Sequence, residues 1–416
     1  MHTPVHTSFH TLGLSEPLLR DLTAAGLLVP TPIQAQAIPP ALEGRDVIGC
    51  AQTGTGKTAA FVVPMIERLA VLPKGQPLAL ILAPTRELAL QIFGSIEKLG
   101  HSHGISATVI VGGSDMQAQI RGLRQRPDIL VATPGRLLDH MWNGTINLAP
   151  IKILVLDEAD RMLDMGFAPQ INQILDALPV ERQTLLFSAT LPTDVTRLVQ
   201  ASLKGAVHVM VTPSSATAEG VTQALHHTTS HEKTNLLVAL LGSERGTVLV
   251  FARTKSRVDR LGQTLEQAGH RVAVIHGDLS LPQRLRALNG FKRGQVRILV
   301  ATDIAARGID VANIGHVVNY DLPNCPEDYI HRIGRTARMK MTGRATSFVT
   351  SEECDQLRAI ETLLGHPVPL AEGSPRPSDR PHSRMPERFR GDRQPWGRPG
   401  EDRRQHQPVP VVPEGG

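Results

Sequence analysis

The stretch AQTGTGKT at positions 51–58 has the residue types that a phosphate-binding loop needs. It follows the apolar run DVIGC and precedes the amphipathic pattern TAAFVVPMIERL, which predicts the order strand, loop, helix. Gly54 and Gly56 let backbone N–H groups wrap a phosphate, and the helix N-terminus adds its positive dipole end. Lys57 would reach the β- and γ-phosphates, and the Thr58 hydroxyl would bind Mg²⁺. The whole loop is expected to line a nucleotide: Ala51, Gln52, Thr53, Gly54, Thr55, Gly56, Lys57 and Thr58.

A second candidate site lies in IKILVLDEAD, residues 151–160, where an apolar run ends in two carboxylates. Ligands bind at the carboxyl ends of buried parallel strands, so Asp157 is placed to hold Mg²⁺ directly or through water. Glu158 is then placed to polarise an attacking water. The alternative is that these acids only favour the N-terminus of the following helix.

The tripeptide SAT, residues 188–190, ends another apolar run. Ser188 and Thr190 are expected to hydrogen-bond Asp160 and so couple the nucleotide site to other parts of the chain. On its own the tripeptide is equally compatible with a simple turn.

Positive charge gathers in HRIGRTAR, residues 331–338, where Arg332, Arg335 and Arg338 recur every three residues around Gly334. Such a run is often a solvated helix face. The second half of the chain has no Gly-rich loop of its own, since ARTKS follows the apolar run TVLVF. The arginines therefore need an anion from elsewhere.

Short apolar runs alternate with helical periods through both halves of the chain, which predicts an α/β fold with parallel sheets covered on both faces. We expect an N-terminal domain at 1–211, a linker at 212–220, a C-terminal domain at 221–370 and a disordered, Arg/Pro/Gly-rich tail at 371–416. The expected strands are 46–50, 78–83, 107–111, 128–132, 151–156 and 184–188, then 224–229, 247–251, 272–275, 297–301 and 316–319.

The composition suits two such domains. The 416 residues are 41% hydrophobic and only 3% aromatic, so Leu, Ile, Val and Ala must build the cores. The net charge of +5 is a mild bias toward polyanions. Three widely spaced cysteines fit neither a disulfide framework nor a zinc motif. With no apolar run of membrane-spanning length, the sequence predicts a soluble, cytoplasmic protein.

Nine motifs occur in a recognisable order: TPIQ, AQTGTGKT, PTRELA, GG, TPGR, DEAD, SAT, ARGID and HRIGRTAR. By them the chain resembles a DEAD-box ATP-dependent RNA helicase over roughly residues 8–365. The resemblance implies two tandem RecA-like domains with ATP and Mg²⁺ as cofactors. It also implies that Gln34 reads the adenine, that Phe9 stacks on the base and that Asp310 contacts the ribose.

The same resemblance gives the arginines their anion. Arg335 and Arg338 would approach the γ-phosphate held by the first domain as arginine fingers, and His331 would help link the two domains. RNA would be held through sequence-independent backbone contacts. The expected RNA-binding residues are Pro84, Thr85, Arg86, Gly113, Thr133, Pro134, Gly135, Arg136 and Thr302.

The implied activity is RNA-stimulated ATP hydrolysis that drives local, non-processive unwinding of short RNA duplexes or remodelling of RNA–protein complexes. A DNA helicase of the wider superfamily and a non-hydrolysing, ATP-gated RNA clamp are the alternatives. The tail would bind RNA or a protein partner, or only solubilise the chain. Two departures from the family pattern stand out: Leu281 for a usual glutamine, and the segment MKMTG after Arg338. Ala51 departs only from the bare phosphate-loop pattern, whose first position is usually glycine.

Overall fold

The computed structural model describes residues 8–51, 54–190, 203–211, 220–306, 314–336, 342–372 and 374. Met1–Ser374 is one compact unit, and the second unit, Pro375–Gly416, lies outside the described residues. The expected linker, except Gly220, also lies outside them, as does nearly all of the expected tail. Among the described helices none is long and apolar enough to cross a membrane.

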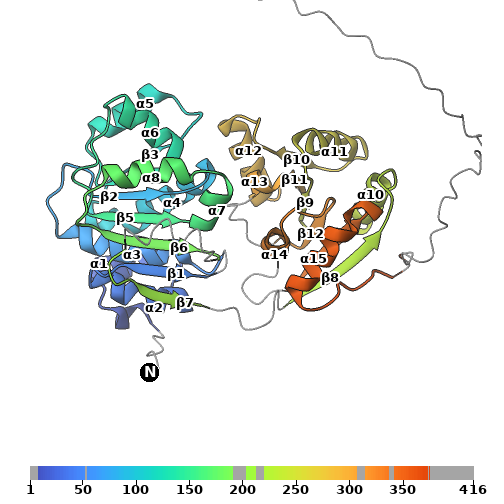
Figure 1. Cartoon of the computed structure of the whole chain (residues 1–416), viewed down its shortest axis with the longest axis horizontal. Coiled ribbons are helices and arrows are strands. Elements are labelled where there is room, and N and C mark those ends of the chain that lie inside the picture. Colours follow the sequence, from blue (N-terminus) through green and yellow to red (C-terminus); the bar gives the residue numbers. More distant parts are fainter. Residues whose placement is uncertain are drawn as a thin grey trace, which may run out of the picture. The chain divides into compact units, whose positions relative to one another are not determined.

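The first sheet has seven parallel strands in the order β3-β4-β2-β5-β6-β1-β7 (Figure 1). Its strands are β1 (Val47–Cys50), β2 (Ala79–Leu82), β3 (Ala107–Ile110), β4 (Ile129–Ala132), β5 (Ile153–Asp157), β6 (Gln183–Ser188) and β7 (Val207–Met210).

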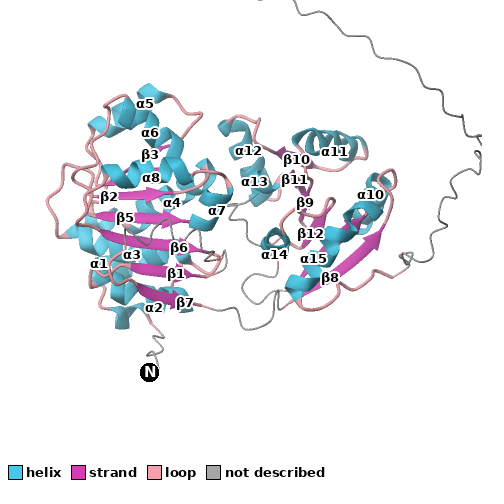
Figure 2. Ribbon diagram, viewed as in Figure 1, coloured by secondary structure: helices cyan, strands magenta, loops and turns pink. Residues whose placement is uncertain are grey.

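Helices cover both faces of this sheet (Figure 2). One layer contains η1 (Phe9–Leu12), α1 (Glu16–Ala24), α2 (Pro32–Leu42), α3 (Lys57–Ala70), α4 (Arg86–Leu99) and η2 (His101–His103). The other contains α5 (Met116–Arg124), α6 (Pro134–Trp142), α7 (Ala159–Asp164) and α8 (Ala168–Ala177). Because neighbouring strand residues face opposite ways, Ile81 of β2 packs in the first layer and Leu80 in the second.

The second sheet has six parallel strands in the order β10-β11-β9-β12-β13-β8. Its strands are β8 (Val221–His227), β9 (Val248–Phe251), β10 (Val272–Ile275), β11 (Ile298–Ala301), β12 (His316–Asn319) and β13 (Gly343–Val349). Its helices are α10 (Lys233–Ser243), α11 (Lys255–Gln267), α12 (Leu281–Lys292), α13 (Asp303–Ala306), α14 (Pro326–Ile333), η3 (Ser351–Glu353) and α15 (Cys354–Leu364). The α/β fold with two parallel sheets is therefore confirmed.

Every expected strand is present within a few residues, but two strands were missed. β7 joins β1 at the edge of the first sheet, and β13 lies between β12 and β8 in the second. β7 has only one fully buried residue, Val209, and β13 begins with the polar-looking GRATS. Neither segment has the continuous apolar run by which the other strands are recognised.

The parallel arrangement puts the candidate residues of the first domain at the carboxyl ends of the strands, which all point to the same side of the sheet. The segments that follow those ends are 51–58 after β1, 84–88 after β2, 112–113 after β3, 133–136 after β4, 157–160 at β5 and 188–190 at β6.

Candidate functional site

The loop after β1 has the backbone of a phosphate cradle. Gly54 and Gly56 have φ values of 84° and 90°, in the left-handed region that favours glycine. A Cβ at Gly56 would lie 2.4 Å from Nε2 of Gln34, so no other residue fits there without displacing that amide. Lys57 begins α3, is 6% exposed and donates from Nζ to the carbonyl of Ala51 at 2.6 Å. The buried ammonium thus lies inside the turn of the loop.

The other predicted loop residues are less constrained. Thr58 is half-buried in the first turn of α3, and Thr55 is half-buried just before it. Gln52 and Thr53 lie outside the described residues.

Gln34 connects the TPIQ segment to this loop. Its Oε1 accepts from the backbone N–H of Thr31 at 2.9 Å, and its Nε2 donates to the carbonyl of Gly56 at 3.0 Å. An amide has a second N–H and a second acceptor lone pair, so both ends keep capacity for one more partner. Phe9 of η1 is 2% exposed and packs in the same apolar layer as α2 and α3.

The two carboxylates at the end of β5 are buried side by side in opposite electrostatic conditions. Burial and the neighbouring Glu158 raise the pKa of Asp157 to about 7. Burial also acts to raise the pKa of Glu158, but the Arg161, Lys57 and Arg335 cations hold that pKa below its ordinary value. Arg161 forms the ion pair, Nη1 to Oε2, at 2.9 Å. Glu158 is therefore ionised, and added positive charge would favour ionisation of Asp157 too.

Asp160 makes both hydrogen bonds expected with the SAT segment. Its Oδ2 accepts from the Thr190 backbone N–H and from Thr190 Oγ1, each at 2.9 Å, and its own N–H donates to Ser188 Oγ at 3.2 Å. Burial opposes ionisation, but the bonds from Thr190 and Ser188 keep the pKa of Asp160 below its ordinary value. The DEAD and SAT segments are thus tied together by an ionised carboxylate.

The arginines of HRIGRTAR do different things. Arg332 is 2% exposed and forms a bidentate pair with Asp303, with N–O distances of 2.5 and 2.6 Å. It also donates to the carbonyl of Asp321 at 2.6 Å and lies 4.9 Å from the ring centre of Phe251. Because all these partners belong to the second domain, Arg332 is an internal anchor of that domain.

Arg335 is the predicted finger that the structure describes. It is buried, and its charge contributes to the lowered pKa of Glu158. His331 Nδ1 lies 3.7 Å from Oδ1 of Asp328 within α14. Arg338 and Asp310 lie outside the described residues.

The loops predicted to bind RNA adjoin one another in the first domain. The Arg86 guanidinium covers the Gly112–Gly113 turn so closely that a Cβ at Gly113 would lie 2.1 Å from Nη1. Arg136 Nη1 donates to the carbonyl of Ser114 at 3.1 Å, which joins TPGR to the same turn. Thr85 caps α4 with its side chain. The remaining predicted contacts also lie at the carboxyl ends of the strands: Pro84, Thr133, Pro134 and Gly135.

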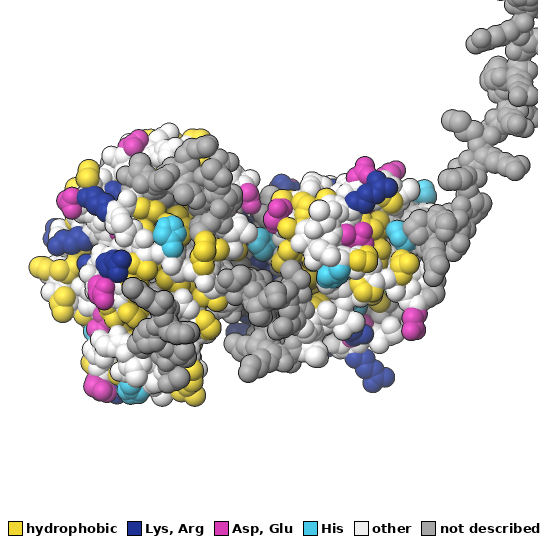
Figure 3. All heavy atoms as spheres, turned by 60° about the horizontal axis from the view of Figure 1, so that its bottom comes forward, with side chains coloured by type: hydrophobic (Ala, Val, Ile, Leu, Met, Phe, Trp, Pro, Cys, Tyr) yellow, Lys and Arg dark blue, Asp and Glu magenta, His cyan; other side chains and the backbone are white. Residues whose placement is uncertain are grey.

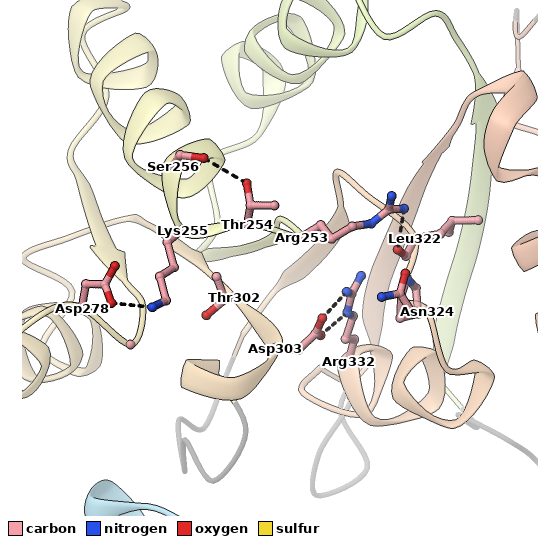
Figure 4. Close-up of a pocket in the computed structure, with 12 residues that line it drawn as sticks. Arg253, Thr254, Lys255, Ser256, Asp278, Thr302, Asp303, Leu322, Asn324 and Arg332 are labelled. Atoms are coloured by element: carbon pink, nitrogen blue, oxygen red, sulfur yellow. Dashed lines mark hydrogen bonds and ion pairs between the residues drawn. The ribbon is translucent and has the colours of Figure 1, made fainter. Parts of the chain in front are cut away.

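The second domain has a pocket of ≈ 670 Å³ that sequence reasoning reached only through Thr302 (Figure 4). Lys255 pairs with Asp278 on one side of it, and Asp303 pairs with Arg332 on the other. The pocket is lined by Arg253, Thr254, Lys255, Ser256, Gly277, Asp278, Thr302, Asp303, Leu322, Pro323, Asn324 and Arg332. The missed signal was ARTKS itself, which supplies two cations and two hydroxyls directly after a strand.

Leu281, which stands where a glutamine is usual, is buried at 8% exposure. It belongs to the same apolar cluster as Leu88 of α4, and three residues further along α12 Arg284 pairs with Glu87 at 2.8 Å. The leucine therefore contributes apolar contact beside an ion pair. The segment Met339–Met341 lies outside the described residues.

Two family models match the chain. The DEAD/DEAH box helicase family matches residues 31–198, and the helicase conserved C-terminal domain matches residues 232–340. The chain belongs to the DEAD-box RNA helicase family. Members of this family are ATPases and helicases, and the chain is an enzyme of that class.

Curated DEAD-box relatives resemble the chain over most of its length. The DEAD-box ATP-dependent RNA helicase CshA of Geobacillus kaustophilus is 45% identical over 356 residues, which cover 85% of this chain and 76% of the relative. The ATP-dependent rRNA helicase RRP3 of Candida albicans is 43% identical over 372 residues, 89% of this chain and 69% of the relative.

Solved DEAD-box structures have the same fold. Saccharomyces cerevisiae Dbp5 bound to RNA and ADP BeF3 matches with a TM-score of 0.79 and 35% identity, covering 87% of this chain and 96% of that one. Mss116p bound to ssRNA and AMP-PNP matches with a TM-score of 0.81 and 28% identity, covering 89% and 80%.

Proposed function

We propose that this DEAD-box enzyme uses RNA-stimulated ATP hydrolysis for local, non-processive unwinding of short RNA duplexes or for remodelling RNA–protein complexes. The observation that carries the proposal is the buried Glu158, ion-paired with Arg161 at 2.9 Å, which lies beside Asp157 at the carboxyl ends of the strands, where the loops proposed to face RNA also lie. The titles of related structures support both ligands, since Dbp5 is bound to RNA and ADP BeF3.

In this proposal the loop after β1 holds the phosphates of ATP. Its backbone N–H groups and the N-terminus of α3 face the phosphate oxygens, and Lys57 exchanges its bond to the Ala51 carbonyl for the β- and γ-phosphates. Gln34 has the free amide capacity for a bidentate adenine contact. Phe9 at the base, Asp310 at the ribose, and Gln52 and Thr53 in the loop complete the proposed nucleotide contacts.

The donor set fits Mg²⁺. Asp157 is buried and receives a hydrogen bond from the Glu158 N–H at 3.0 Å, and its pKa is raised by burial and by the neighbouring Glu158. Asp157, directly or through water, and the Thr58 hydroxyl would supply hard oxygen ligands of the kind that Mg²⁺ prefers. When bound, the ion would neutralise charge on the phosphates.

Hydrolysis then requires a base and additional positive charge. Glu158, held by Arg161 and kept ionised, accepts a proton from the attacking water. Arg335 and Arg338 stabilise the charge that spreads over the transferred phosphoryl oxygens. Arg332 is not part of this set, because its guanidinium is committed to Asp303 and Asp321.

RNA would lie across the loops of both domains. The first domain offers the adjoining Arg86, Gly113 and Arg136, and the second offers the pocket that contains Thr302 and Lys255. Basic and acidic side chains are interspersed over the face that Figure 3 shows. N–H, hydroxyl and guanidinium groups contact phosphate and sugar without reading base sequence.

Asp160, Ser188, Thr190 and His331 would couple nucleotide state to RNA binding. The proposed boundaries are 1–211 for the ATP-binding domain, 212–220 for the linker and 221–370 for the helicase domain. The tail, 371–416, would contribute a further RNA or protein contact.

The test is the steady-state ATPase rate without nucleic acid, with single-stranded RNA and with DNA of the same sequence. We expect strong stimulation by RNA only, because the 2′-OH distinguishes the two polymers. Equal stimulation by DNA would favour a DNA helicase, and no turnover with either would favour an ATP-gated clamp. Unwinding of duplexes of increasing length should show activity only on short ones; uniform activity would contradict the non-processive mechanism.

A further inference from the structure

A chain of buried polar side chains runs behind the Gly112–Gly113 turn. Gln119 of α5 is 7% exposed and His140 of α6 is 0% exposed. Gln119 Nε2 donates to the carbonyl of Val111 at 2.9 Å, and its Oε1 lies 3.1 Å from His140 Nε2. His140 Nδ1 lies 2.8 Å from Thr145 Oγ1. Three side chains from two helices and a loop thus form one series of hydrogen bonds that ends at the Val111 carbonyl, which Gln119 contacts.

The hydrogen-bond directions follow from the two ends of the chain. Because Gln119 donates from Nε2 to a carbonyl, its Oε1 must accept, and His140 must carry its proton on Nε2. Nδ1 of a neutral imidazole then accepts the single hydroxyl proton of Thr145, and the His140 carbonyl, which also lies 3.0 Å from Thr145 Oγ1, keeps the Thr145 backbone N–H as its donor. Burial, and secondarily the Arg136 charge, lower the pKa of His140 although Asp139 acts against them, so the imidazole is neutral. Every member of the chain is satisfied in this one arrangement.

The Val111 carbonyl, which these side chains hold, lies at the start of the turn proposed to face RNA. Val111 directly follows β3, and the turn Gly112–Gly113 comes next. At the other end Arg136 donates to the carbonyl of Ser114. The turn is therefore fixed at both ends by side chains and covered by Arg86 between them.

We propose that Gln119 and His140 are positioning residues for RNA binding. They set the Val111 carbonyl, and through it the orientation of the Gly112 and Gly113 backbone N–H groups toward a phosphate. This inference rests on the proposed role of Gly113 and Arg136 in binding RNA. It adds two buried residues that would act through the turn and not by contacting RNA themselves.

A purely structural role is the competing explanation, because any buried polar side chain that loses its partner destabilises the fold. The protein offers a matched control in Gln183 of β6, which is 5% exposed and donates to the carbonyls of Ala41 and Arg45 at 2.9 and 2.7 Å. Gln183 begins β6, so it lies at the amino ends of the strands, whereas the Gly112–Gly113 turn lies at their carboxyl ends. The two glutamines thus make similar hydrogen bonds at opposite ends of the strands.

The experiment compares Gln119→Met with Gln183→Met in the full chain, measuring RNA-stimulated ATPase activity against RNA and against ATP. For Gln119→Met we expect the KM for RNA to rise about 3- to 10-fold, the effect of one lost hydrogen bond, with kcat at saturating RNA and the KM for ATP unchanged. Gln183→Met should lower Tm as much as Gln119→Met does and leave the KM for RNA unchanged. Equal KM values for RNA in the two variants would overturn the proposal.

A second pair keeps the proposal testable if Gln119→Met does not fold. His140→Gln keeps an N–H that can face Gln119, whereas His140→Leu does not, so only the leucine variant should raise the KM for RNA. ¹⁵N spectra of the wild type should show the Nε2-protonated tautomer of His140 and a Gly113 amide resonance that shifts in Gln119→Met. An unmoved Gly113 resonance would refute the positioning role, whether or not RNA stimulates the wild-type ATPase. Absence of that stimulation would be a separate failure, of the proposed function.

Discussion

Each domain has a strand–loop–helix junction whose helix begins with lysine, yet the two junctions are built for different ligands. After β1, Gly54 and Gly56 take left-handed φ values and no side chain caps α3. After β9, the Thr254 side chain caps α11 by accepting from the Arg257 N–H at 3.2 Å. A helix N-terminus binds phosphate through free N–H groups, so the first terminus is open to a ligand and the second is partly self-satisfied.

The lysines follow the same division. Lys57 is buried and directed into its own loop, whereas Lys255 is exposed and paired with Asp278 at the rim of the pocket. A buried cation over a glycine turn suits a compact triphosphate. An exposed cation among hydroxyls suits an extended phosphate backbone. In the proposed function the same fold position would therefore serve as a nucleotide site in one domain and a nucleic-acid site in the other, through differences in capping and burial.

The largest effect on kcat is expected for an arginine of the second domain that would contact ATP bound by the first domain. Arg335→Ala should lower kcat by about 10³- to 10⁵-fold, the range of arginine fingers in related NTPases, with nucleotide binding largely retained. Single-turnover ATP hydrolysis and binding of a fluorescent ATP analogue measure the two quantities separately. Arg332→Ala is the contrast: because Arg332 pairs with Asp303 inside the second domain, its loss should mainly lower Tm. Unchanged turnover in Arg335→Ala would remove the finger assignment.

The two lysines test the comparison directly. Lys57→Ala should lower kcat by about 10²- to 10³-fold, as expected for a preorganised charge at the reacting phosphates. Lys255→Ala should leave ATP binding intact, raise the KM for RNA severalfold and reduce the salt slope of RNA binding by about 1. Titrations with ATP and with RNA at several salt concentrations distinguish them. If Lys255→Ala impaired ATP binding instead, the two junctions would not be divided as described.

Capping gives a smaller effect on stability. Thr254→Ala should destabilise the second domain by about 1 kcal/mol, which corresponds to roughly 2–4 °C in Tm. Thr85→Ala, which removes the cap of α4, should cost the first domain a similar amount. Calorimetry measures the Tm of each variant. Neither substitution should create a second ATP site, since left-handed glycines would still be missing after β9; a second bound equivalent of nucleotide in Thr254→Ala would show that the cap alone, and not the missing glycines, excludes nucleotide there.

Sequence reasoning predicted the parts of the molecule in which a local pattern carries the information. Continuous apolar runs predicted eleven of the thirteen described strands, and motif order predicted the segments that contribute to the site. Spacing alone did not separate Arg332 from Arg335, and only the family resemblance did, because spacing does not reveal that Asp303, 29 residues earlier, takes the first guanidinium. Gln119 and His140 were missed for the same reason: 21 residues separate them, and only the packing of α5 against α6 brings them together.

The smallest predicted effect concerns acid stability, to which each domain contributes a buried, neutral histidine. His316 of β12 is 2% exposed; burial lowers its pKa, with Arg344 assisting and Glu244 opposing. The unfolded state then takes up a proton first, so stability is full above about pH 6.5 and falls as the pH drops toward the folded-state pKa. His316→Gln and His140→Gln should each flatten this fall in the Tm measured by calorimetry between pH 7.5 and 5. An unaltered pH slope in both variants would mean that other groups control the acid limb.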